Sequence, residues 1–86
     1  MKIHVESTTK MVQLEVQIQG RGVAVPARIW EGHTEDGTPV HCYITRICPS
    51  IVEPVPEAIA KKFAAELQEC VPPSVGVQAI PLRLIL

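Results

Sequence analysis

A strict two-residue alternation of apolar and polar side chains is the feature that most limits how this chain can fold. Valine, leucine or isoleucine fills the even positions from 12 to 18, and glutamine or glutamate fills the odd positions from 13 to 19. Successive side chains of a β-strand point to opposite faces of its sheet, so the run predicts a strand with one buried and one solvated face. The fold must therefore contain a sheet with at least one covered face.

Three further runs alternate in the same way. Residues 23–29 follow a short glycine-containing connection that favours a hairpin, and residues 40–47 follow a second turn. Residues 2–6 predict a first strand that is short and can merge with the next one. Pro26 lies inside the 23–29 run and has no N–H to donate, which indicates a strand end, a bulge or a sheet edge there.

The second half of the chain predicts one helix and one terminal strand. Within residues 57–70 the apolar positions Ile59, Phe63 and Leu67 have helical spacing and form one stripe. Prolines precede this segment and end it. Residues 75–86 favour a final strand, and Pro81 either restricts it to an edge or marks where a new strand begins.

The predicted order is β-β-β-β-α-β, in a single domain covering residues 1–86. We expect an α+β fold in which an antiparallel sheet has one helix packed on one face. Eighty-six residues leave no room for a second core, and a domain of this size is only marginally stable alone. Self-association is therefore a fair expectation, and pairing of two terminal strands offers a route to a homodimer.

Composition and charge narrow the classes of function. The formal net charge is −1, and the eight Lys and Arg residues are scattered without a basic stripe, which argues against electrostatically driven nucleic-acid binding. The first ten residues lack the apolar region of a secretory signal. The apolar runs fall far short of the ~20 residues that a membrane helix needs. We expect a soluble cytoplasmic protein without membrane contact.

The segment 25–47 gathers most of the chemically distinctive side chains, including the only Trp and the only Tyr. Its turn contains Asp36 and Gly37, a pair that favours positive φ angles. A turn of even length would place four side chains together on the solvated face, namely Arg28, Trp30, His41 and Tyr43. It would also place Cys42 beside Ile29 in the core. An odd-length turn or a bulge would change this grouping, which therefore depends on register.

A metal site and an active site are both poorly supported by the sequence. His33, His41, Cys42 and Cys48 could be imagined as ligands, but adjacent His41 and Cys42 point to opposite faces of a strand. The two cysteines are also about 20 Å apart along it at ~3.3 Å per residue, and no CxxC spacing is present. No phosphate-binding glycine loop, nucleophile elbow or carboxylate pair occurs. We expect neither an enzyme nor a cofactor.

The residues of the candidate site therefore indicate a recognition surface. A Trp and a Tyr flanked by Arg28 and His41 are typical of a protein-binding hot spot. The alternative is a nucleic-acid-binding regulator that stacks bases on the two aromatic rings beside Arg21, Arg28 and Arg46. A purely structural interpretation also stays open, in which Trp30 packs under the helix or the terminal strand and Tyr43 fills cross-strand space.

Two runs of the chain carry a resemblance to known sequences, RIWEGHTEDGTPVHCYITRI and AIPLRLIL. They resemble small uncharacterised accessory proteins of bacterial mobile elements, such as integrative conjugative elements and phages. The resemblance implies a non-enzymatic inhibitor or regulator, with anti-CRISPR proteins among the examples, and a bacterial host or mobile-element protein as its partner. It supplies no reaction, no cofactor and no functional residues.

Overall fold

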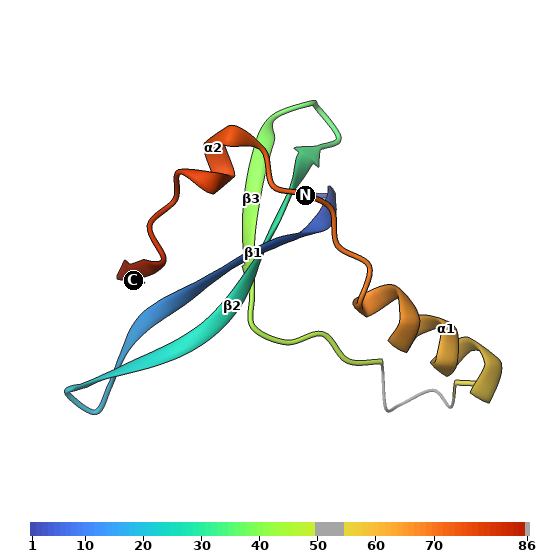
Figure 1. Cartoon of the computed structure of the whole chain (residues 1–86), viewed down its shortest axis with the longest axis horizontal. Helices are drawn as coiled ribbons and strands as arrows, with labels where there is room; N and C mark the ends of the chain where they lie inside the picture. The colour runs from blue at the N-terminus through green and yellow to red at the C-terminus, as the bar shows by residue number, and fades with distance from the viewer. Residues whose placement is uncertain (50–54, 86) are drawn as a thin grey trace.

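A computed structural model describes residues 1–49 and 55–85 of the chain, and Figure 1 shows their arrangement. The elements, in chain order, are β1 (Ile3–Ile18), β2 (Arg21–Thr34), β3 (Pro39–Ile44), α1 (Glu57–Leu67), α2 (Val75–Gln78) and β4 (Arg83–Ile85). The strands form one four-stranded sheet in the order β3-β2-β1-β4. The predicted α+β class is confirmed.

β1 and β2 form a long antiparallel hairpin that makes up most of the sheet. Ile18 pairs with Arg21, so Gln19 and Gly20 alone make the turn, with φ angles of 51° and 77°. Positive φ at both central residues suits the right-handed twist of the flanking strands. The first two predicted strands are therefore one continuous strand here, β1.

A bulge interrupts the pairing of β1 with β2 between Ser7 and Met11. Thr8 lies in this bulge with its side chain fully buried, and its hydroxyl donates to the carbonyl of Ile29 at 2.7 Å. The free edge of β1 then pairs with the segment after α1. Thr9 N donates to Val71 O at 3.0 Å, and Val71 N donates to Ser7 O at 3.0 Å. The bulge thus attaches the second half of the chain to the sheet.

β4 runs parallel to β1, with Leu84 opposite Leu14, so the sheet is mixed. The prediction of a wholly antiparallel sheet is wrong at this strand. The physical reason is that the chain already runs parallel to β1 at Val71, which bridges Thr8 before α2, and it keeps this direction into β4. Pro81 lies just before β4 and marks the start of a new strand. This is one of the two roles predicted for it.

The short helix α2 occupies residues that were predicted as strand. Ser74 caps its first turn, where the Ser74 hydroxyl accepts a hydrogen bond from Val77 N at 3.4 Å. Val77 is fully buried and joins the core, which consists of Val12, Leu14, Ala27, Ile29 and Val77. The core face of the sheet is thus covered by α2.

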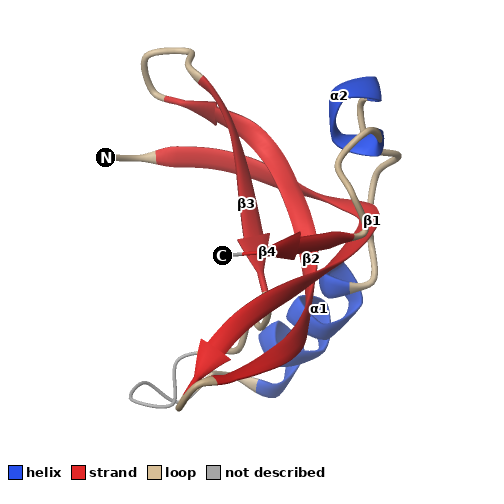
Figure 2. Ribbon diagram, turned by 90° about the vertical axis from the view of Figure 1, so that its left-hand side faces the viewer, coloured by secondary structure: helices blue, strands red, loops and turns tan. Residues whose placement is uncertain are grey.

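Helix α1 begins at the predicted residue and ends at Leu67, three residues before the predicted end. None of its residues is buried. Figures 1 and 2 show the two helices well apart, with α1 projecting away from the strands. The predicted packing of this helix on a sheet face is therefore not confirmed in the single chain. No helix in the described ranges is long and apolar enough to cross a membrane.

Candidate protein interaction site

The β2–β3 turn fixes which side chains share a face of the sheet. Thr34 N donates to Thr38 O at 3.0 Å, so residues 35–37 form the turn, with Gly37 at φ 85°. This odd number of turn residues, with a glycine in the left-handed region, is typical of a hairpin that closes on a bulge. The register then pairs Trp30 with Cys42 and Ile29 with Tyr43.

The predicted grouping of the four candidate side chains on one face is therefore wrong. Arg28 and Trp30 lie on the face that carries Cys42, while His41 and Tyr43 lie on the core face. The prediction assumed an even turn, and a change of one residue moves every β3 side chain to the other face. Cys42 is likewise outside the core in which it was expected.

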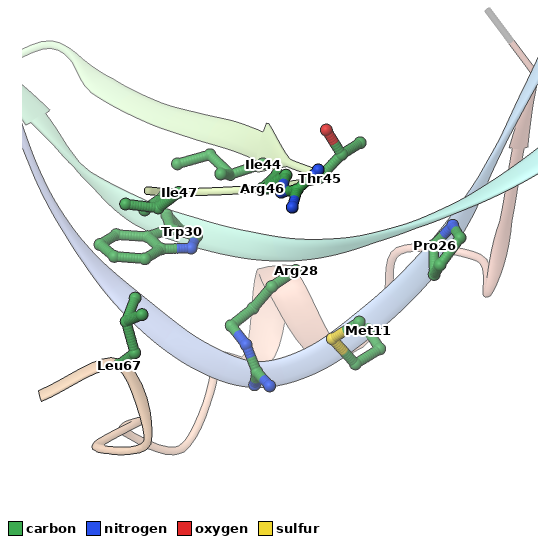
Figure 3. A pocket seen from close by; sticks show the side chains of 9 residues that line it. All are labelled: Met11, Pro26, Arg28, Trp30, Ile44, Thr45, Arg46, Ile47 and Leu67. Carbon is green, nitrogen blue, oxygen red and sulfur yellow. The ribbon is translucent and has the colours of Figure 1, made fainter. Parts of the chain in front are cut away.

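The face that carries Trp30 holds an open groove, shown in Figure 3. We call it the Trp30 groove. Its lining consists of Met11, Pro26, Arg28, Trp30, Ile44, Thr45, Arg46, Ile47 and Leu67. These residues come from all three long strands, the segment after β3 and the end of α1. In Figure 3 the indole ring of Trp30 lies between Ile47 and Leu67. Of these residues, Arg28 and Trp30 were predicted as partner-binding residues, and Arg46 was predicted in the alternative nucleic-acid site.

Arg28 is held in place by the bulge in β1. One of its terminal nitrogens, Nη1, donates to the carbonyl of Thr8 at 2.7 Å, and the side chain is half-buried. The guanidinium keeps further N–H donors for a ligand. Arg46 is exposed at the same groove, and no carboxylate lies among the lining residues. The groove is therefore apolar with a positive rim.

Trp30 also lines a second hollow on its other side, between the start of β1 and the residues that follow α1. Two glutamates of the second half of the chain, Glu66 and Glu69, line this hollow, whereas the Glu6 side chain lies on the core face opposite Glu31. A third hollow shares Met11 and Pro26 with the Trp30 groove. Trp30 thus lies between a groove lined by arginines and a hollow lined by glutamates. The surface therefore combines an apolar anchor with positive charge on one side and negative charge on the other.

Tyr43 belongs to the core face, where it is half-buried and packs against the core cluster. The structural interpretation of Tyr43 as a packing residue accounts for this placement. His41 is exposed and pairs across the sheet with Glu31. The backbone N–H of Ser74 donates to Glu31 Oε2 at 2.8 Å. This bond lowers the pKa of Glu31, and the charge of His41 lowers it further.

The three histidines lie on this core face together with Glu6 and Glu31, between the hydrophobic core and the β2–β3 turn. His4 pairs with His33, with ring centroids 6.0 Å apart, and Glu6 pairs with Glu31. Within residues 1–49 and 55–85, no three His, Cys, Asp or Glu side chains are arranged to hold a metal ion.

The chain matches no protein-family model, no curated protein and no solved structure. Its function must therefore be argued from the groove and from the shape of the molecule.

Proposed function

We propose that this chain is a non-enzymatic protein-interaction module that binds its partner through the Trp30 groove. The observation that carries the proposal is the mismatch between its surface and its size. The chain exposes 6728 Å², whereas a compact monomer of 9.4 kDa exposes about 5,000 Å². Its Cα radius of gyration is 15.1 Å, against about 12 Å for a compact domain of this length.

The surplus of about 1,700 Å² exceeds the ~800 Å² that one partner buries in a standard interface. Much of this surface is apolar. Exposed hydrophobic side chains occur on β1, on α1 and before β4, with Met11, Ile59 and Leu82 as examples. Exposed hydrophobic side chains on several elements support a protein that works in a complex.

Trp30 is the anchor of the proposed contact, and Arg28 is its polar neighbour. Trp and Arg are the residue types most enriched among binding hot spots, particularly where a surrounding rim excludes water. The apolar residues that would exclude water around Trp30 are Met11, Ile44 and Leu67. The positive edge of the groove fits an apolar segment that carries carboxylates. His41 and Tyr43 lie on the other face, so in this proposal they are not part of the groove contact.

The resemblance of residues 28–47 and 79–86 to accessory proteins of mobile elements supports a partner from a bacterial host or from the element itself. An inhibitor of host machinery, of the anti-CRISPR kind, is the specific form of the proposal. Such proteins act by occupying a surface, which needs a shaped groove and no catalytic group.

Capture experiments from a bacterial lysate test the proposal. Trp30→Ala should remove the specific partner, because truncation of a central Trp commonly costs at least 2 kcal/mol of binding. The control is Ile18→Ala, which alters an exposed residue near the far hairpin turn and should capture the same partner. A partner set that is unchanged by Trp30→Ala would refute the groove as the binding site.

A nucleic-acid-binding regulator is the second candidate, because Arg28 and Arg46 line the groove beside an aromatic ring. Two features weigh against it. Glu66 and Glu69 line the hollow on the other side of Trp30 and would repel phosphates. The third arginine of this hypothesis, Arg21, lies at the far end of the β1–β2 hairpin. Binding to DNA or RNA that falls steeply with salt would favour this candidate.

A further inference from the structure

Helix α1 and the Trp30 groove are two unpartnered apolar surfaces of the same chain. No residue of α1 is buried, and Ile59, the first residue of its apolar stripe, is 57% exposed. In the groove, Met11 is 42% exposed. The single chain brings only Leu67, the last residue of α1, to the groove. The rest of the helix has no buried residue, and Ala60 and Phe63 are half-buried.

We propose that the segment seated in the Trp30 groove is α1 of a second copy of this chain. Each copy of the resulting twofold dimer inserts its helix stripe into the groove of the other. This inference rests on the proposed interaction function of the Trp30 groove, and a host or mobile-element partner would then compete with the second copy for the groove.

The size of the core argues for a second copy. Five hydrophobic residues of the described chain are buried, and one of them comes from the four-residue helix α2. So small a core gives little stability to a single chain, and obligate dimers commonly complete their core across the interface. A twofold arrangement forms the same contact twice. Two helix–groove contacts can therefore bury the surplus surface of both chains at once.

The charges of the two surfaces are complementary. With 3.6 residues per turn, Glu66 borders the apolar stripe beside Ile59, whereas Glu57, Lys61 and Lys62 lie further round the helix. Each of these glutamates pairs with a lysine of the next turn, at 3.3 Å for Glu57–Lys61 and 3.8 Å for Lys62–Glu66. The Glu66 carboxylate therefore borders the stripe, where it can meet a guanidinium group of the groove. A net charge of −1 gives little repulsion between copies.

The oligomeric state of single-residue variants tests the proposal. Wild-type protein should sediment as a dimer at micromolar concentration. Ile59→Glu puts a charge into the stripe and should weaken dimerisation by about a hundredfold, because an unpaired charge cannot enter an apolar groove. The matched control is Ala58→Glu, which adds the same charge to the opposite side of α1 and should leave the dimer intact. Both positions are exposed, so neither change removes a core contact.

Mixing two variants separates this arrangement from other dimers. Met11→Glu changes the groove instead of the helix, and Arg28, its cross-strand neighbour, compensates the new charge in the folded chain. Ile47→Glu, at another exposed groove position, serves the same purpose if Met11→Glu does not fold. Each variant alone should be monomeric. A mixture with Ile59→Glu should form a heterodimer, because one intact helix still meets one intact groove.

A mixture that stays monomeric would overturn the proposal, as would a dimer that Ile59→Glu does not weaken. Wild-type protein that is monomeric at all concentrations would also overturn it, and a radius of gyration near 12 Å would then show that α1 folds onto its own sheet. In those cases, loss of a lysate partner in Trp30→Ala would still support the proposed function. A dimer that captures no lysate partner would support the second copy as the occupant of the groove and would count against an external partner.

Discussion

Trp30 lies directly opposite Cys42 on β3, and its neighbour Ile29 lies opposite Tyr43. This register divides the two aromatic residues of the β2–β3 hairpin between two tasks. Tyr43 packs on the core face, while Trp30 lies in an open groove on the other face. Substitutions at the two positions should therefore affect different properties.

Tyr43→Ala should lower the free energy of unfolding by about 1–2 kcal/mol, because a half-buried ring that contacts the core is lost. Tyr43→Phe keeps the ring and should stay within about 0.5 kcal/mol of wild type. Urea titration followed by circular dichroism measures both values. An unfolding midpoint in Tyr43→Ala equal to that of wild type would show that the ring does not support the core.

The pattern of the sequence predicted β2, β3 and the start of α1, because alternation and helical spacing are local properties. It did not predict the face on which Trp30 lies. Asp36-Gly37 suits both a two-residue turn and a turn that closes with Gly37 in the left-handed region, and the two differ in parity. The alternating valines at 75 and 77 favoured a strand, while Ser74 was an N-cap signal that pointed to α2.

Other parts of the site depend on contacts that no local pattern encodes. The sequence predicted a short first strand that can merge with the next one, but the burial of Thr8 depends on the carbonyl of Ile29 across the sheet. Leu67 reaches the groove because the segment after α1 pairs with the bulged edge of β1. The parallel direction of β4 likewise follows the path of the chain after α1, which already runs parallel to β1 at Val71.

Gly32→Ala should destabilise the protein strongly. A Cβ at this position would collide with the backbone carbonyl of His4 and would lie 2.8 Å from Val5 Cα. Neither backbone atom can move without disturbing the β1–β2 ladder, and we expect a loss of about 2 kcal/mol or more. Gly76→Ala is the control, and it should change stability in the opposite direction. Nothing lies within 4 Å of its Cβ, so alanine in α2 should stabilise the protein by up to about 1 kcal/mol. Thermal unfolding of both variants checks the contrast.

The hydrogen bond between Ser74 N–H and Glu31 should make stability depend on acid pH. This bond and the nearby His41 lower the folded-state pKa of Glu31 below its ordinary value of 4.5. The unfolded chain therefore takes up the Glu31 proton first as the pH falls. The stabilisation is complete above pH 4.5 and is lost as the pH drops through the lower, folded-state pKa.

Glu31→Gln removes this titration and should flatten that part of the stability profile. Glu57→Gln, on the exposed surface of α1, removes the same charge without touching α2 and should keep the wild-type slope. Denaturant midpoints collected from pH 3 to pH 6 compare the three proteins. Equal slopes in Glu31→Gln and wild type would disprove the link.

Thr8→Val should show how much the bulge in β1 depends on one hydroxyl group. The Thr8 hydroxyl donates to Ile29 O at 2.7 Å and accepts from Lys10 N at 3.2 Å, and Thr8 is fully buried. Valine keeps the shape but leaves both backbone groups without this partner, so we expect a loss of about 1–3 kcal/mol. Thr9→Val alters an exposed neighbour whose side chain makes no such contact, and it should change stability little.

Hydrogen exchange supplies a second measurement of how the Thr8 hydroxyl supports the bulge in β1. Thr9 N–H and Val71 N–H are bonded across the bulged edge of β1, and both should exchange faster in Thr8→Val than in Thr9→Val. Faster exchange confined to these amides would show that the hydroxyl holds the segment after α1 against the sheet, and with it the Leu67 side of the Trp30 groove. Unchanged exchange at both amides would mean that the bulge keeps its form without the Thr8 hydroxyl.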